Sequence, residues 1–188
     1  KKKITIGYIG TIDKTRGVDC VIKAMEFLPK KFILRIVGNI KIKNENEKFE
    51  DWYRILMDKN FHNERIIYSS FVPYNQVTSI IDDCNIVIAP GSQTDRHVSE
   101  YASPLKIFDY MVRGKIIISA KLAGHMDVLY DKVNCIFYEP DNPKDLANSI
   151  LLASENSNLS NSIAKKAFKN SLNYTLEKRA DKISNFFS

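Results

Sequence analysis

Short, continuously apolar runs alternate along the chain with longer segments whose apolar residues recur every three or four positions. A run of about four to eight apolar residues is typical of a parallel strand that is buried on both faces. Runs of this kind occupy Ile4–Gly10, Phe32–Gly38, Arg65–Val72, Asn85–Ala89, Lys115–Ala120 and Cys135–Tyr138. Because parallel strands need crossover connections, the alternation predicts a doubly wound α/β domain. We expect a mostly parallel, Rossmann-like sheet of about six strands with helices on both faces.

The segments between these runs carry helical periodicity and boundary signals. Val18, Val21 and Ile22 begin one apolar helix face after Gly17, and Pro29 ends that helix. Further helices are expected at Phe49–Asn60, 73–81, 104–112, Met126–Tyr130, Pro143–Ala153, Asn161–Leu172 and Leu176–Phe187, and a polar loop at Asn39–Lys48. The strands and helices form one closed set, so residues 1–188 are expected to be a single domain.

Composition narrows the class of protein moderately. Of the 188 residues, 44% are hydrophobic and 27% charged, as in an ordinary globular domain. The net charge of +6 comes with lysines scattered along the chain, which argues against a nucleic-acid partner. Cys20, Cys84 and Cys135 lie in or beside apolar segments without metal-ligand spacing, so we expect reduced core residues of a cytoplasmic protein. No apolar run approaches the ~18 residues of a membrane span, and no signal peptide is visible.

Candidate chemistry concentrates in the segment that follows the fourth apolar run. Ser103 is a good N-cap and Pro104 a good first helical residue, so a strand leads here through a loop into a helix. An open α/β sheet binds its ligand at such a place, and the amides of Leu105 and Lys106 would hold an anion, typically a phosphate. Lys106 adds a cation in the first turn, and Asp109 adds a carboxylate on the same side. The alternative is that Lys106 and Asp109 form only an exposed ion pair.

The sixteen residues that begin at Ser103, SPLKIFDYMVRGKIII, resemble the donor-site segment of the family 4 retaining glycosyltransferases. In that family an acidic residue lies mid-helix, before a methionine and a Gly-Lys strand start. Similar segments elsewhere in the chain are Gly10–Gly17, Leu34–Gly38, Ile67–Val72 and Asn134–Pro140. The resemblance covers almost the whole chain. It implies the C-terminal, nucleotide-sugar-binding half of a two-Rossmann-domain (GT-B) enzyme, with the N-terminal acceptor domain absent.

The resemblance also implies roles for individual residues. Arg16 and Lys106 would be the catalytic cations that stabilise the leaving diphosphate. Arg16 stands where the family has a lysine, and Thr11 stands where it has its first arginine. Asp109 matches the acid that holds the ribose, shortened by one methylene.

The sugar-side acid of the family has no direct counterpart. Tyr101 occupies its position, and Glu100 is adjacent, one residue out of register, so either residue could contact the sugar. The resemblance further implies that a strand-end glycine lets the chain pass close to the nucleotide and that a strand exit contacts the base. The donor-binding residues that complete the set are Gly38, Val72, Ser103 and Leu105.

As a whole protein, the resemblance implies a retaining hexosyltransferase that moves a sugar from a nucleoside-diphosphate sugar to a glycan or lipid-linked acceptor, without metal or cofactor. Its partners would be the nucleotide sugar and its own acceptor domain. Membrane contact, at the inner face, would come only through that missing half, and the fragment alone would be inactive. Two other functions stay open: a non-catalytic nucleotide-binding or interaction module, and, less favoured, half of a nucleotide-sugar epimerase. The sugar, the base, the acceptor and the oligomeric state stay open too.

Overall fold

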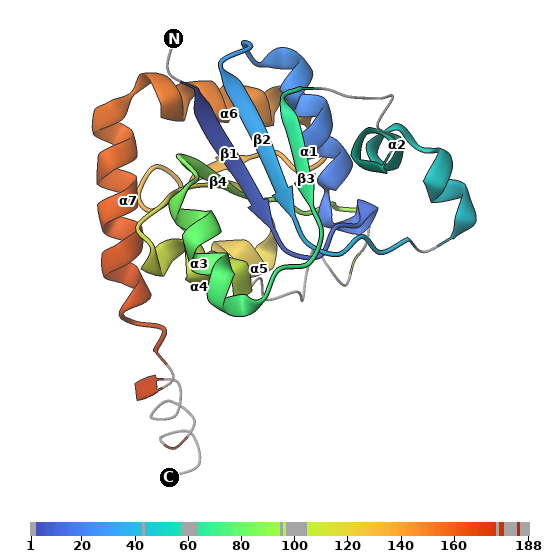
Figure 1. Ribbon diagram of the computed structural model, residues 1–188. Coiled ribbons are helices and arrows are strands. Elements are labelled where there is room, and N and C mark those ends of the chain that lie inside the picture. The colour runs from blue at the N-terminus through green and yellow to red at the C-terminus, as the bar shows by residue number, and fades with distance from the viewer. Residues whose placement is uncertain are drawn as a thin grey trace.

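A computed structural model describes residues 3–42, 44–57, 64–94, 96, 105–175, 177–178 and 184. Its centre is a six-stranded sheet in the order β3-β2-β1-β4-β5-β6, with every neighbouring pair parallel (Figure 1). The strands are β1 (Ile4–Ile9), β2 (Phe32–Val37), β3 (Ile66–Ser69), β4 (Ile86–Ala89), β5 (Ile116–Ala120) and β6 (Ile136–Tyr138). The predicted doubly wound sheet is confirmed. Its strand order reverses between β1 and β4, and ligands of open α/β sheets bind at the carboxyl ends of strands at such a point.

Both faces of the sheet are buried, which is why the strands are apolar throughout rather than alternating with polar residues. In β1, Ile6 and Tyr8 belong to one core cluster, and Ile9 belongs to the other. In β4, Ile88 and Val87 divide in the same way.

Seven α-helices of the described residues cover these two faces. Helices α1 and α6 pack on the face of Tyr8, and α3 and α4 pack on the opposite face (Figure 1). The helices are α1 (Val18–Ala24), α2 (Asp51–Met57), α3 (Tyr74–Asp82), α4 (Leu105–Val112), α5 (Ala123–Met126), α6 (Pro143–Glu155) and α7 (Ser157–Ser171). Short 3-10 helices occupy Lys14–Arg16, Met25–Phe27 and Glu45–Phe49. The three cysteines are free and buried in these cores, as predicted.

The structure corrects the expected helix at Met126–Tyr130. Helix α5 begins and ends earlier, at Ala123–Met126. The buried His125 explains the shift, because its Nδ1 lies 2.7 Å from the hydroxyl of Ser119 and 3.0 Å from the carbonyl oxygen of Ala120. These side-chain bonds tie the helix to the end of β5, and periodicity of apolar residues could not reveal them.

Two further boundaries differ from the expectations. The expected loop Asn39–Lys48 includes most of a 3-10 helix, Glu45–Phe49. Helix α7 begins at Ser157 rather than at position 161, because the side chain of Asn156 accepts a hydrogen bond from the amide of Leu159 at 3.0 Å and caps it. Most of the helix expected after position 175 lies outside the described residues.

Candidate functional site at the carboxyl ends of β1 and β4

Two glycines allow the carboxyl ends of β1 and β2 to touch. Gly10 and Gly38 follow these strands with φ values of 144° and 147°, which only glycine adopts easily. A Cβ atom on Gly38 would clash with the carbonyl oxygen of Gly10. The amide of Gly10 in turn donates to the carbonyl of Val37 at 2.9 Å. The two strand ends therefore approach each other through backbone alone, and a side chain on Gly38 would prevent that approach.

A second close approach joins the turn after β1 to the turn after β4. A Cβ atom on Gly17 would lie 3.1 Å from the amide nitrogen of Gly91. The amide of Ser92 donates to the carbonyl of Thr15 at 3.2 Å. The 3-10 helix Lys14–Arg16 is thereby held at the exit of β4, at the point where the strand order reverses.

Asp13 organises this turn and holds Arg16 in it. Its Oδ1 accepts hydrogen bonds from the amide of Arg16 at 2.9 Å and from the hydroxyl of Thr15 at 2.7 Å. Its Oδ2 lies 3.6 Å from the Nε of Arg16. That Nε is buried and makes no hydrogen bond within the described part of the chain, whereas the Arg16 side chain as a whole is 40% exposed.

Lys106, in the first turn of α4, reaches back over β1. Its Nζ lies 4.4 Å from the centroid of the Tyr8 ring, a cation–π distance, and a Cβ on Gly10 would meet it at 3.1 Å. Burial of the ammonium group, with the nearby charge of Arg16 as a smaller cause, lowers the pKa of Lys106 to about 7. The hydroxyl of Tyr8 donates to the carbonyl of Thr11. The two predicted catalytic cations thus lie in one cluster, in which Asp13 is the carboxylate that acts on Lys106 among the residues that the structure describes.

Asp109 lies one turn further along α4 and points to α3. Its Oδ1 accepts a hydrogen bond from the hydroxyl of Tyr74 at 3.1 Å, and burial raises the pKa of its carboxyl group. No ion pair joins Lys106 and Asp109, both of which the structure describes. The alternative of a simple exposed pair is therefore wrong, and the two side chains serve separate places on the same edge of the sheet.

The remaining predicted residues divide between described and undescribed positions. Leu105 begins α4, and 71% of its surface is exposed. Val72 is partly buried against the core. The sugar-side residues and the predicted cap, Glu100, Tyr101 and Ser103, lie outside the described residues.

Sequence reasoning missed Tyr8 and Asp13 in the cluster around Lys106, and Tyr74 beside Asp109. Asp13 could have been found, because an aspartate three residues before Arg16 matches the pattern of a helix N-cap. Tyr8 looked like any apolar strand residue. Lys14, a further cation of the same turn, pairs with Glu50 at 2.9 Å.

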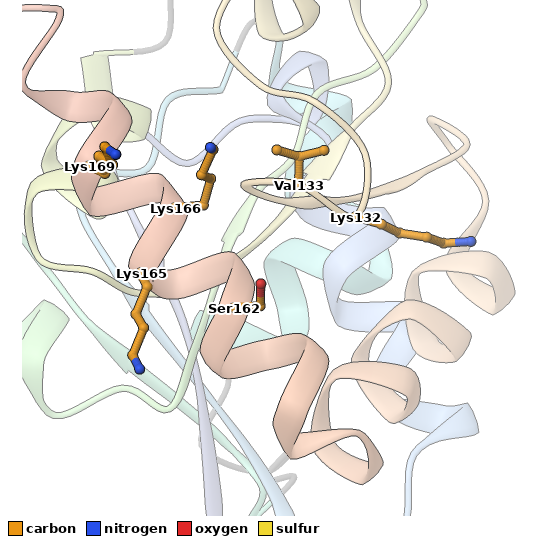
Figure 2. A pocket seen from close by; sticks show the side chains of 6 residues that line it. All are labelled: Lys132, Val133, Ser162, Lys165, Lys166 and Lys169. Carbon is orange, nitrogen blue, oxygen red and sulfur yellow. The ribbon is translucent and has the colours of Figure 1, made fainter.

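A cavity of about 550 Å³ lies elsewhere, between α7 and the loop before β6 (Figure 2). Figure 2 shows that the side chains of Lys132 and Lys165 point away from each other rather than toward one centre. We call Lys165, Lys166 and Lys169 the α7 lysines; all three are exposed. Because no buried group converges here, this cavity is not the candidate site.

The described residues offer neither a metal-binding cluster nor a membrane-spanning helix. Within the described ranges, no group of three or more His, Cys, Asp or Glu residues is placed to hold a metal ion. The helices of those ranges include none that is long and apolar enough to cross a membrane.

The comparisons with known proteins identify the family. The chain matches "Glycosyl transferases group 1" over residues 1–170, and it belongs to that family. An uncharacterized glycosyltransferase of Methanocaldococcus jannaschii is 28% identical over 166 residues, which are 85% of this chain and 38% of that protein.

Solved structures support the same fold. HepE of Anabaena, crystallised in complex with UDP and glucose, superposes with a TM-score of 0.83 at 18% identity over 99% of this chain and 48% of that one. The C-terminal domain of LpcC, a glycosyl transferase group 1 family protein of Francisella tularensis, gives a TM-score of 0.75 at 18% identity over 93% of this chain and 88% of that domain. The architecture is thus that of one Rossmann-like half of a GT-B glycosyltransferase. The chain spans less than half the length of the relative from M. jannaschii and of HepE.

Proposed function

We propose that this chain is the donor-binding half of a family 4 retaining glycosyltransferase. The complete enzyme would transfer a hexose from a nucleoside-diphosphate sugar to a glycan or lipid-linked acceptor. The observation that carries the proposal is the pair of cations, Arg16 and Lys106, that lie with Asp13 at the carboxyl end of β1. UDP and glucose bound to HepE, a structural neighbour, support this assignment.

The Lys106 ammonium group is poorly solvated, and burial, with the charge of Arg16 as a smaller cause, lowers its pKa. An anion bound beside it would favour the charged amine. A diphosphate would be such an anion, and the first amides of α4 would donate to its oxygens. The absence of side chains at Gly10 and Gly38 would let the nucleotide approach closely.

The same groups would act in catalysis. As the bond between the sugar and the diphosphate breaks, negative charge grows on the leaving oxygen. Arg16 and Lys106, already in position, would stabilise that charge more strongly in the transition state than in the bound substrate. In this role Arg16 and Lys106 would supply the positive charge themselves, so the proposal includes no metal ion and no other cofactor.

Asp109 would bind the ribose hydroxyls of the donor. Its carboxylate lies on the helix that begins at the phosphate position, and Tyr74 holds it from α3 at 3.1 Å. The sugar itself would contact Glu100 or Tyr101, at positions that precede α4.

The acceptor and the remaining catalytic groups would come from a second, N-terminal domain. The match covers 48% of the HepE chain, which supports the presence of a second domain in the complete enzyme. An open half-site cannot exclude water or align an acceptor, so residues 1–188 alone should bind a donor weakly and transfer nothing. Membrane contact, if the acceptor is lipid-linked, would then belong to the second domain, and the complete enzyme would work in the cytoplasm.

A calorimetric screen of UDP-, GDP- and ADP-sugars against the chain tests the proposal. We expect one nucleotide class to bind, with the corresponding free nucleoside diphosphate as a competitor. Absence of binding by all three classes would overturn it.

A second candidate, a non-catalytic nucleotide-binding module, is favoured by one observation: Thr11 replaces the family's first arginine, and its carbonyl is already bonded to Tyr8. Incubating the complete protein with the donor that binds and candidate acceptors separates the two. Sugar transfer supports the enzyme, whereas binding without transfer or donor hydrolysis supports the module.

A further inference from the structure

The ring of Tyr8 lies directly beneath the Lys106 ammonium group. Tyr8 is fully buried, and its hydroxyl is fixed by the carbonyl of Thr11. The face of an aromatic ring carries negative potential, so at 4.4 Å it attracts a cation. An aliphatic strand residue would fill the same space without that attraction.

Gly10 completes the place in which the ammonium group lies. A Cβ atom there would meet the Nζ and Cε of Lys106 at 3.1 and 3.2 Å. The ammonium group therefore lies between a ring face and a bare stretch of backbone. These contacts favour one conformation of the Lys106 side chain, unlike the many that an exposed lysine adopts.

We propose that Tyr8 is a positioning residue whose ring face holds the Lys106 ammonium group at the phosphate position, and that Lys106 takes up a proton when a diphosphate binds. This inference rests on the proposed function. It assigns a role to Tyr8, for which the family resemblance implies none. It also adds the proton taken up by Lys106 to the binding equilibrium.

The pKa values of Lys106 and its neighbours indicate which of these groups titrates near neutral pH. Burial, followed by the charge of Lys106, lowers the pKa of His125 to about 4, so that ring is neutral near pH 7. Tyr8 stays protonated, because burial raises the pKa of its hydroxyl. Lys106, with a pKa of about 7, is the group that changes charge. Among the described residues, Arg16 and Asp13 of the turn after β1 act on Lys106 by their charge, the Tyr8 ring faces it from β1, and His125 of α5 is affected by the Lys106 charge; Asp109 lies three residues further along α4.

The sign of the linkage follows directly. Above pH 7 the free protein holds Lys106 mostly neutral, and a bound diphosphate raises the pKa of that amine again. Binding therefore takes up a proton, and affinity falls as pH rises above about 7, by at most tenfold per pH unit. The terminal phosphate of a nucleotide, with a pKa of about 6, is already ionised in that range.

The first experiment needs no ligand. Lysine side chains labelled with ¹³C at Cε are titrated by NMR, and Lys106 is assigned by its absence in Lys106→Arg. The comparison is between Tyr8→Phe and the same chain with trifluorophenylalanine at position 8, because fluorine withdraws charge from the ring face at nearly constant size. We expect the Lys106 midpoint near pH 7 in Tyr8→Phe and lower by roughly half to one pH unit in the fluorinated chain.

Equal midpoints in those two chains would overturn the role of Tyr8, since a merely structural ring would not respond to fluorination. A Lys106 midpoint near 10 in the wild type would overturn the assignment of the proton as well. Tyr8→Phe keeps the ring and its packing, so both comparisons use chains that retain the core.

The second experiment measures the proton. UDP is titrated calorimetrically into the chain at pH 8 in Tris and in HEPES, whose ionisation enthalpies differ, and the difference gives the protons exchanged. We expect the uptake of nearly one proton in the wild type and of almost none in Lys106→Arg, whose side chain is always charged. UDP binding without proton uptake would overturn the inference but leave the proposed function intact. A chain that binds none of UDP, GDP and ADP at pH 6.5 or 8 would overturn both.

Discussion

Lys106 and the α7 lysines carry the same kind of side chain in two contrasting settings. Lys106 lies over Tyr8 beside a second cation, and burial lowers its pKa to about 7. The α7 lysines are exposed and follow one another along α7, where they line a cavity that is open to solvent (Figure 2). The second region holds more lysines and lines a cavity of about 550 Å³, but only the first region holds a lysine whose charge is disfavoured by burial. Desolvation and fixed geometry, rather than the number of lysines, mark the candidate binding site.

The largest expected effect is on the free energy of unfolding, and it is measured by replacing one glycine at the strand ends and one glycine beside α7. Gly38→Ala places a Cβ against the Gly10 carbonyl and should lower the free energy of unfolding by about 3–5 kcal/mol. Gly114→Ala, beside α7, meets Phe168 only at 3.7 Å and should cost about 1–2 kcal/mol, the ordinary cost of its positive φ. Denaturant unfolding measures both. Equal losses would show that the strand-end approach imposes no special constraint.

The next effect concerns stability and pH. The unfolded chain keeps Lys106 protonated up to its ordinary pKa of 10.5, whereas the folded chain releases that proton near pH 7. The ligand-free protein is therefore destabilised at pH 7 and below, and the penalty fades as pH rises toward 10.5. Lys106→Met should raise the free energy of unfolding by about 2–4 kcal/mol at pH 7, since one pKa unit is worth about 1.4 kcal/mol.

Lys166→Met is the matched control for that experiment. It removes the same charge from the exposed face of α7, and its stability should stay within about 0.5 kcal/mol of the wild type at every pH. If the two variants gave the same pH profile, burial of Lys106 would have no thermodynamic consequence.

The smallest effect concerns the ribose. Asp109→Asn should reduce the preference for UDP over 2′-deoxy-UDP by about 1 kcal/mol, the usual contribution of one hydrogen bond. Tyr74→Phe, which removes only the supporting hydroxyl, should keep most of that preference. Competition binding with the two nucleotides measures the difference. A variant that discriminates as strongly as the wild type would remove Asp109 from the ribose position.

The sequence allowed the sheet to be predicted because each strand is an uninterrupted apolar run, and the order of strands and helices then left few topologies. Lys106 and Asp109 could be proposed because they lie on a helix that follows a strand, and Arg16 because the segment Gly10–Gly17 resembles the phosphate-binding turn of the glycosyltransferases. Tyr8 could not be identified, because its role depends on a lysine 98 positions away along the chain. Helix α5 was misplaced for a similar reason, since hydrogen bonds of His125, and not periodicity, fix it.

The most direct test of the account compares two variants of equal net charge. UDP affinity is measured calorimetrically at pH 7 in 100 mM salt for the wild type, Lys106→Met and Lys166→Met. We predict that Lys106→Met weakens binding by about 1–3 kcal/mol, as expected for the loss of a charged hydrogen bond, and that Lys166→Met changes affinity by less than about twofold. Equal weakening in both variants, or none in Lys106→Met, would contradict the assignment of the phosphate site to the carboxyl ends of β1 and β4.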